Sequence, residues 1–191
     1  MVETEWFTYA GPPKCGNHWI TAAMKRAGVV SFDSREMHVP GHVPGRPRVT
    51  LVREPATWLR SFFLNLHGPM GVPCVDVFQA LRGQYQESFE GFGWRYVNAM
   101  PGQISKMYMA YESEIELRTE HLGSDTAAML SSLNVPCDFE SVRALGKVGK
   151  TLATAPMSDE VRAAINATDF YLGDRTPAPA PSRGLSLKGS V

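Results

Sequence analysis

The stretch that decides the fold covers residues 5–19 and has the sequence EWFTYAGPPKCGNHW. Residues 5–10 are aromatic and β-branched, which predicts a short buried strand. A Gly-Pro-Pro turn follows. Over residues 17–27 the apolar side chains then recur at three- and four-residue spacing, which predicts a helix. A strand, a glycine-bearing loop and a helix N-terminus form a cradle where backbone N–H groups converge on an anion. We therefore expect residues 11–18 to bind a phosphate group.

The rest of the chain alternates between strand and helix patterns. The predicted strands cover residues 29–32, 48–52 and 104–111, and the predicted helices cover residues 55–66, 75–84, 125–133, 138–145 and 158–167. A loop with three prolines separates the first two of these strands. This alternation predicts an α/β fold with three layers, α/β/α, around a central parallel sheet. Ligands of such sheets bind at the carboxyl ends of the strands.

The composition is that of a globular protein with no excess charge. The chain has 191 residues, with 19 Lys and Arg against 19 Asp and Glu. This balance disfavours a protein that coats nucleic acid, but a small phosphorylated ligand needs only a few local cations. We expect a single domain over residues 1–175. The tail, residues 176–191, is rich in Pro, Ala and Ser, and we expect it to be disordered.

The cysteines and the hydropathy pattern indicate a cytoplasmic protein. The three cysteines are odd in number and form no CxxC pair, which argues against a disulfide framework or a zinc site. The first residues, MVETEWFTYAG, are acidic and lack the apolar centre of a signal peptide. No apolar run approaches 18 residues, so we expect no membrane partner.

The first loop differs from the phosphate loop of ATP- and GTP-hydrolysing proteins. The spacing from Gly11 to Gly16 matches the outer frame of a Walker A motif. That motif places Lys and then Ser or Thr directly after the second glycine, where they bind phosphate and magnesium. Here Asn17 and His18 occupy those positions, and the lysine, Lys14, precedes the glycine. A nucleotide site with a magnesium ligand in this loop is therefore disfavoured.

The segment PKCGNHW at residues 13–19 resembles the 5′-phosphosulfate-binding loop of PAPS-dependent sulfotransferases, whose usual form is PKSGTTW. PAPS is 3′-phosphoadenosine-5′-phosphosulfate. The positions that match are Pro13, Lys14, Gly16 and Trp19, and those that differ are Cys15, Asn17 and His18. A cysteine in place of serine keeps the size of the side chain but weakens its hydrogen bonds. Asn17 and His18 still carry donors for phosphate oxygens.

A second constellation follows the strand predicted at residues 48–52. Arg53 stands at the end of this strand, and Ser61 follows eight positions later on a predicted helix. This pair resembles the 3′-phosphate element of the sulfotransferases, in which a strand ends in Arg and a Ser follows on the helix. A guanidinium group fits a phosphate bidentately. The alternative is that Arg53 pairs with a carboxylate and that Ser61 only packs.

Three further residues are candidates by resemblance. Tyr111, in a Tyr-Glu pair, is similar to an element near the adenosine site of the family. Lys147 and Lys150 lie in a basic, glycine-containing loop before the last predicted helix, where the family often covers the 3′-phosphate; a solvated loop is the alternative. Trp19 offers an aromatic face on which adenine could stack, and a core role is the alternative.

Sulfuryl transfer requires a base for the acceptor hydroxyl and a cation beside the departing phosphate. Lys14 fits the second role by its place in the loop. The base of the family is a histidine in a loop between the two motifs, often in the sequence Thr-His-Leu-Pro. This chain offers His38 and His42, each followed by Val-Pro. We favour His38 because of its context, and Glu36 is a third possibility.

The resemblance implies the P-loop NTPase-like sulfotransferase fold. It also implies transfer of a sulfuryl group from PAPS to the hydroxyl or amine of a small molecule or glycan. PAP is then the second product, and no metal is required. The chain is shorter than the usual family domain, which suits an open acceptor site. Two alternatives stay open. One is a small-molecule kinase on a P-loop scaffold, and the other is a PAP- or nucleotide-binding module without catalysis. The sequence does not indicate the oligomeric state.

Overall fold

The computed structural model describes residues 1–29, 37–41, 43–66, 88–146, 148 and 155–169. These residues contain a mixed sheet of four strands in the order β1-β2-β3-β4. The strands are β1 (Val2–Glu3), β2 (Thr8–Tyr9), β3 (Arg48–Val52) and β4 (Ile115–Arg118). β2, β3 and β4 run parallel, and β1 pairs antiparallel with β2 at the edge. The predicted parallel sheet is thus present with an antiparallel strand added.

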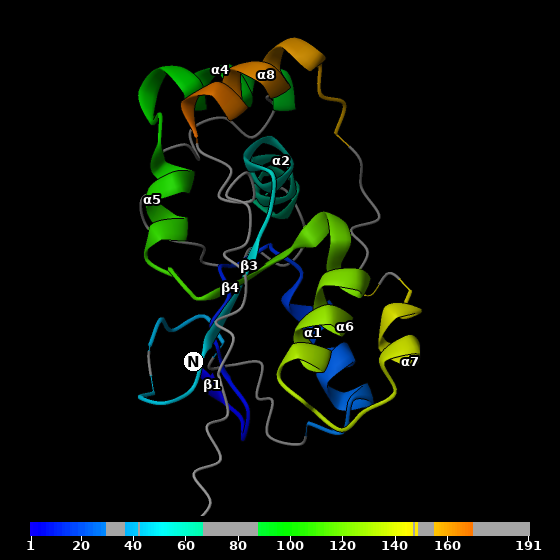
Figure 1. Ribbon diagram of the computed structural model, residues 1–191. Helices are drawn as coiled ribbons and strands as arrows, with labels where there is room; N and C mark the ends of the chain where they lie inside the picture. The colour runs from blue at the N-terminus through cyan, green and yellow to red at the C-terminus, as the bar shows by residue number, and fades with distance from the viewer. Residues whose placement is uncertain (30–36, 42, 67–87, 147, 149–154, 170–191) are drawn as a thin grey trace, which may run out of the picture.

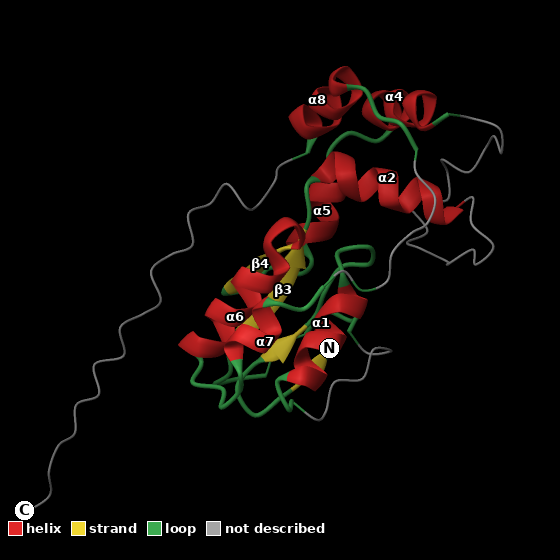
Figure 2. Cartoon of the chain, turned by 90° about the vertical axis from the view of Figure 1, so that its right-hand side faces the viewer, coloured by secondary structure: helices red, strands yellow, loops and turns green. Residues whose placement is uncertain are grey.

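The helices form two groups around this sheet (Figures 1 and 2). One group lies beside the sheet and consists of α1 (Asn17–Arg26), α6 (Leu122–Ser132) and α7 (Phe139–Arg143). The other gathers beyond the carboxyl end of β3 and consists of α2 (Pro55–Leu66), α4 (Phe89–Ala99) and α8 (Asp159–Thr168). α5 (Gln103–Met109) and the short 3₁₀ helix η1 (Thr119–His121) flank β4 along the chain. The α/β class is confirmed for the described residues.

Several elements follow their sequence patterns closely. β3 and α2 have the predicted bounds, and α1 begins at the predicted residue. Asp138 and Ser158 cap α7 and α8, since their side chains accept hydrogen bonds from the backbone N–H of Ser141 and Val161. The strand predicted at residues 5–10 is limited to Thr8–Tyr9. The expectations for residues 30–32, for the helix at 75–84 and for the tail lie outside the described residues.

The strand predicted at residues 104–111 is wrong, because this segment is the helix α5. Its buried residues, Ile104, Ser105 and Tyr108, recur at helical spacing. The many apolar and aromatic residues of this segment are also typical of a strand, which explains the wrong prediction. The strand of this region is β4, which begins at Ile115.

α4 was not predicted, because residues 85–101 are aromatic and glycine-rich and show no clear period in the sequence. Its buried residues nevertheless include Phe89, Phe92 and Tyr96 at helical spacing. Gly93 lies on the same face, where an added Cβ would come within 2.7 Å of Val161 Cγ1. The glycine therefore permits a close approach between α4 and α8.

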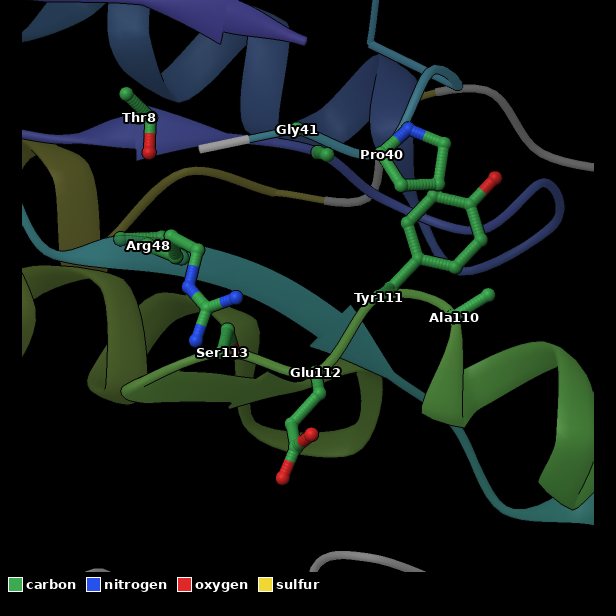
Figure 3. Close-up of a pocket in the computed structure, with 10 residues that line it drawn as sticks. Thr8, Pro40, Gly41, Arg48, Ala110, Tyr111, Glu112 and Ser113 are labelled. Carbon is green, nitrogen blue, oxygen red and sulfur yellow. The ribbon is translucent and has the colours of Figure 1, made fainter. Parts of the chain in front are cut away.

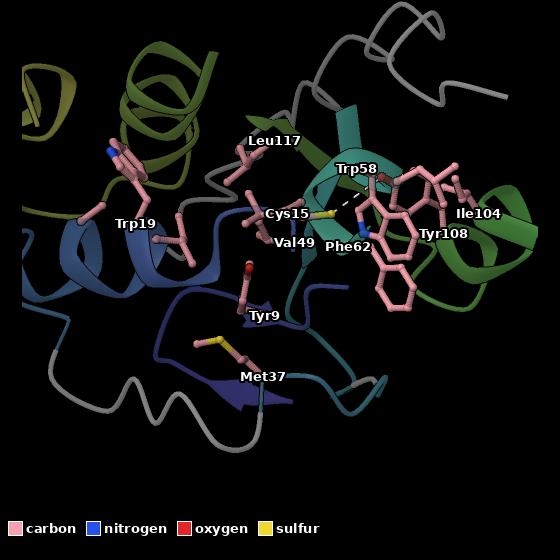
Figure 4. Packing of buried hydrophobic residues seen from close by; sticks show 14 of the residues in the cluster. Tyr9, Cys15, Trp19, Met37, Val49, Trp58, Phe62, Ile104, Tyr108 and Leu117 are labelled. Atoms are coloured by element: carbon pink, nitrogen blue, oxygen red, sulfur yellow. Dashed lines mark hydrogen bonds between the residues drawn. The ribbon is translucent and has the colours of Figure 1, made fainter. Parts of the chain in front are cut away.

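A single hydrophobic core joins the sheet to both groups of helices. Figure 4 shows its centre, where Trp58 and Phe62 of α2 pack beside Tyr108 of α5. The rings of Trp58 and Phe62 are stacked, with their centroids 5.4 Å apart. Cys15 and Leu51 are fully buried in the same cluster. The loop after β2 and the helix after β3 therefore pack against the same hydrophobic core.

Asp169 connects three of the helices from a buried position at the end of α8. Its side-chain oxygens accept hydrogen bonds from the Tyr96 hydroxyl (2.6 Å), the Ser105 backbone N–H (2.8 Å) and the Ser105 hydroxyl (3.1 Å). Asp169 is only 2% exposed. The carboxylate thus satisfies an N–H group in the first turn of α5 and ties α4 to the end of α8.

We expect Asp169→Ala to destabilise the fold by about 3 kcal/mol, because it leaves buried donors without an acceptor. For a chain of this length, this corresponds to a decrease of about 10 °C in melting temperature. Urea unfolding followed by circular dichroism measures the change. Asp159→Ala, at the exposed start of α8, is the matched control, and equal stability of the two variants would contradict this role.

Candidate functional site

The carboxyl ends of β2, β3 and β4 bring together the two motifs that are predicted to bind phosphate. The loop of residues 11–16 leaves β2, Arg53 leaves β3, and Thr119 and Glu120 follow β4. The Thr119 hydroxyl lies 2.7 Å from the Cys15 carbonyl oxygen and 2.9 Å from that of Val52. It therefore holds the first loop against the end of β3. This is the edge of the sheet where α/β proteins bind their ligands.

The first loop has the backbone shape of an anion cradle. Lys14 and Gly16 both have positive φ angles, of 66° and 100°. Gly16 stands at the N-cap of α1, and its carbonyl accepts hydrogen bonds from Trp19 and Ile20. No side chain caps this end of α1 within the described residues. The N–H groups that precede Trp19 at this end of α1 are therefore the ones that a bound anion would engage.

A circuit of hydrogen bonds joins this loop to Arg53. Arg53 Nη1 donates to the Lys14 carbonyl (2.9 Å). The Arg53 carbonyl accepts from the Tyr108 hydroxyl (2.8 Å), whose oxygen lies 3.8 Å from the Cys15 Sγ that donates to it. Because Lys14 and Cys15 are adjacent, these hydrogen bonds connect Arg53 and Tyr108 to two neighbouring residues of the loop. They fix the guanidinium group of Arg53 directly beside the loop.

The Arg53 guanidinium group still lacks an acceptor. Its Nε is buried and has no hydrogen-bond partner in the part of the chain that the structure describes. Among the same residues no carboxylate forms an ion pair with Arg53, so the alternative of a structural pair finds no support there. Burial lowers the pKa of Arg53, although Cys15, Tyr108 and Glu120 oppose this effect. A buried cation with a missing acceptor is stabilised by a bound anion.

Ser61 lies on the face of α2 that contacts the first loop. One turn before it, the Trp58 indole N–H donates to the Pro13 carbonyl (2.7 Å). One turn after it, the Asn65 Oδ1 accepts from Lys14 Nζ (3.0 Å). Residues three and four apart share a helix face, so Ser61 faces the loop between these contacts. Arg53, Ser61 and Lys14 are therefore brought to one region.

Two residues of the first motif, Asn17 and Trp19, have inward-facing side chains. Asn17 Nδ2 donates to the Pro12 carbonyl (2.8 Å), and its Oδ1 accepts from the Tyr9 hydroxyl. The Trp19 indole N–H donates to the Gly146 carbonyl (3.1 Å), and its ring is buried. These contacts favour the core role of Trp19 over adenine stacking and give Asn17 a role inside the loop.

Residue 11 must be glycine because the Tyr9 hydroxyl and the Asn17 side chain fill the space where a Cβ would lie. A Cβ on Gly11 would overlap the Tyr9 hydroxyl and lie 2.5 Å from Asn17 Oδ1. By contrast His18, in the first turn of α1, is exposed. It is the one differing residue of the motif whose side chain faces solvent.

His38 lies at the entrance of the loop. Its Nδ1 is 2.9 Å from the Gly11 carbonyl oxygen, and Gly11 N–H donates to the Met37 carbonyl (2.8 Å). A carbonyl oxygen only accepts, so Nδ1 carries the hydrogen in this contact, and the tautomer with a single hydrogen on Nδ1 has a lone pair on Nε2. This is the tautomer that a general base requires.

Tyr111 lies beside His38. Its hydroxyl donates to the His38 carbonyl (2.8 Å). It also lines a cavity of about 320 Å³ next to this segment. The remaining candidates, His42, Lys147, Lys150 and Glu36, lie outside the described residues.

Glu54, in the turn after Arg53, connects this turn to α8, the last described helix. Its carboxylate accepts from Asn166 Nδ2 (2.8 Å) and from the Thr57 hydroxyl, and pairs with Arg162 Nε (3.3 Å). Burial raises the pKa of Glu54, but these hydrogen bonds outweigh it and hold the pKa below its ordinary value. Asn166 Oδ1 also accepts from the Ala56 backbone N–H (3.1 Å). α8 thereby holds the start of α2 in place.

Sequence patterns did not reveal Tyr108, Thr119 or Asn65. Tyr108 was assigned to a strand, and its contact with Cys15 spans 93 positions of the chain. Asn65 could have been found, because it lies one turn after Ser61. Among the described residues, no three His, Cys, Asp or Glu side chains gather as a metal site would require. None of the described helices is long and apolar enough to cross a membrane.

We expect the stability of the fold to decrease between pH 8 and pH 10 because of Cys15. Burial raises the pKa of this thiol from 9.0 to about 12, although the Tyr108 hydrogen bond and Arg53 lower it. The folded chain therefore keeps a proton that the unfolded chain releases above pH 9, and the stabilisation is lost as the pH rises toward 12. The expected decrease is about 1 kcal/mol between pH 8 and pH 10.

Urea unfolding at several pH values measures this effect, with Cys15→Ala as the comparison. The variant lacks the thiol, so its stability should fall less steeply over the same range. Parallel pH profiles for the two chains would contradict a buried, protonated Cys15.

Comparisons with known proteins add no further information. No family model, no curated protein and no solved structure matches the chain. The function proposed below therefore depends on the residues of this site.

Proposed function

We propose that this chain binds PAPS and transfers its sulfuryl group to an acceptor hydroxyl. The observation that carries the proposal is the buried Arg53 guanidinium group, whose Nε has no acceptor among the described residues and whose Nη1 donates to the first loop. PAPS carries anionic groups at both ends of its ribose, at the 5′ and 3′ positions. Two anion-binding elements joined by a direct hydrogen bond suit such a donor.

In this proposal each motif binds one end of the donor. The N–H groups of the first loop and of α1 bind the 5′-phosphosulfate. Arg53 and Ser61 bind the 3′-phosphate, for which a guanidinium fork is well suited. Lys14 supplies positive charge to the 5′-phosphate as it departs, which lowers the barrier to transfer.

His38 is the proposed base. As the acceptor oxygen forms its bond to sulfur, its proton moves to His38 Nε2. At the same time the bond between sulfur and the bridging oxygen of the 5′-phosphate breaks, and PAP leaves with the electron pair. The products are PAP and a sulfate ester, and the imidazolium returns its proton to water. The Gly11 carbonyl stabilises this imidazolium through its hydrogen bond to Nδ1.

The second candidate is a PAP-binding module without catalysis. It is favoured by Cys15, which stands where the sulfotransferases have serine, because its thiol points into the core toward Tyr108. A kinase is a weaker alternative, since both polar ends of the Asn17 side chain bond to other residues of the chain. Asn17 stands at the position of the Walker A lysine, and His18, at the next position, offers no hydroxyl for a magnesium ion.

We expect PAP to raise the melting temperature by about 5–10 °C at a concentration of 100 times its dissociation constant. ATP with magnesium should give no shift. Arg53→Ala should abolish the shift, and Arg53→Lys should retain part of it, because lysine keeps the charge but loses the fork. Differential scanning fluorimetry makes the measurement.

Arg143→Ala is the matched control, since Arg143 is exposed and its side chain pairs with Glu140 on the surface of α7. Ser61→Ala tests the same site if Arg53→Ala does not fold. A chain that PAP does not stabilise at millimolar concentration would refute the donor assignment, and a shift with ATP and magnesium would favour the kinase.

We expect His38→Gln to reduce sulfuryl transfer by a factor of about 10² to 10⁴, because it removes the base. Its thermal shift with PAP should stay unchanged, since His38 is not proposed to bind the donor. Release of PAP from PAPS, measured by chromatography in the presence of acceptor, follows the reaction. Wild-type chain that binds PAP without turning over PAPS would indicate the binding module.

A further inference from the structure

The cavity beside His38 lies on the face of the sheet away from α1. Thr8 and Arg48 are register partners in β2 and β3, so their side chains leave the same face. Tyr9 leaves the opposite face, where its hydroxyl meets Asn17 of α1. Figure 3 shows Thr8 and Arg48 at one end of the cavity and Tyr111 with Pro40 at the other. The full lining consists of Thr8, Ala10, Pro40, Gly41, Arg48, Val49, Ala110, Tyr111, Glu112 and Ser113.

The wall of this cavity includes the residues that surround His38. Ala10 directly precedes Gly11, whose carbonyl holds the His38 ring. Pro40 and Gly41 follow His38 in the chain, and the Tyr111 hydroxyl holds its carbonyl. A molecule in the cavity would therefore lie next to the proposed base.

The charged residues around the cavity are one cation, Arg48, and two carboxylates, Glu112 and Glu114, which leaves a negative excess. Arg48 Nε donates to Glu114 (3.1 Å), and Glu114 also accepts from the Arg48 backbone N–H (2.7 Å). Glu112 adds a second carboxylate to the lining and is exposed. An anionic ligand is therefore disfavoured. The terminal nitrogens of Arg48 and the oxygens of Glu112 offer donors and acceptors for neutral hydroxyl groups.

The lining and the volume of the cavity indicate what kind of ligand would fit. The Tyr111 and Pro40 rings supply apolar surface for the C–H groups of a ring. The Thr8 hydroxyl is buried in the wall with no hydrogen-bond partner among the described residues, although Thr8 is only 1% exposed. Such a group lacks the partner that a buried hydroxyl normally has, and a ligand hydroxyl would supply one. A volume of about 320 Å³ is at the lower end for ligand pockets, which suits one ring.

We propose that this cavity binds a neutral pyranose ring, as a free sugar or at the end of a glycan, and presents one of its hydroxyls to His38. The acceptor role rests on the proposed sulfotransferase function. The binding itself does not depend on PAPS, so it can be tested separately.

Saturation-transfer NMR with the full chain tests the binding without donor. The probes are methyl β-D-glucopyranoside, methyl β-D-galactopyranoside and maltotriose, with methyl β-D-glucuronide as the matched anion. We expect saturable binding of at least one neutral probe and at least tenfold weaker binding of the glucuronide. A tighter complex with maltotriose would identify a glycan end as the ligand, and a tighter complex with a methyl glycoside would identify a free sugar.

Two substitutions distinguish a ligand site from a structural void. Thr8→Val keeps the shape of the side chain and removes a hydroxyl that bonds to no described residue. It should weaken glycoside binding about threefold, while the unfolding midpoint and the PAP shift stay as in the wild type. Tyr111→Ala should weaken binding at least tenfold. Glu140→Gln, on the exposed surface of α7, is the control and should change nothing.

The outcomes separate the two proposals. PAP stabilisation without binding of any neutral glycoside overturns the pyranose site and leaves the donor assignment standing. Glycoside binding without PAP stabilisation supports the pyranose site and refutes the donor assignment. Preference for the glucuronide, or binding that neither Thr8→Val nor Tyr111→Ala weakens, also overturns the pyranose site.

Discussion

The hydrogen bond from Arg53 Nη1 to the Lys14 carbonyl is the contact on which the rest of the site depends. It joins the turn after β3 to the loop after β2, and the loop is otherwise held by hydrogen bonds through Tyr108 and Thr119. Lys14 has a positive φ angle, which is unusual for a residue with a side chain. A donor fixed at its carbonyl helps to maintain this conformation. The two motifs that are predicted to bind phosphate are therefore joined directly in the fold.

Two buried polar clusters organise the helices around this contact. Near the sheet, Cys15 and Tyr108 connect the first loop to α5. At the far end of α5, Asp169 satisfies the first turn of the same helix and binds Tyr96 of α4. α5 is thus held at both ends by buried hydrogen bonds. This explains why a segment with an ambiguous sequence pattern forms a helix, because its buried groups are satisfied only in that conformation.

The sequence predicted the parts of the site that depend on local patterns. The Arg53 element was predicted from its resemblance to the sulfotransferases, and the strand and helix that carry it, β3 and α2, follow local sequence patterns. The first loop was found because its glycines and lysine lie close together in the chain. Tyr108 could not be found in this way, since its role depends on partners that are distant in sequence. The inward-facing side chain of Asn17 could not be found either, because it results from the packing of Tyr9 against α1.

The glycine in the middle of α4 has a consequence that reaches far from its own position. Gly93 lets α8 approach α4, and α8 carries Asn166 and Arg162, which hold Glu54 beside Arg53. A side chain at position 93 would push α8 outward and pull on the turn that aims the guanidinium group. The orientation of a guanidinium group that is proposed to bind the donor thus depends on how closely two helices outside the proposed site approach each other.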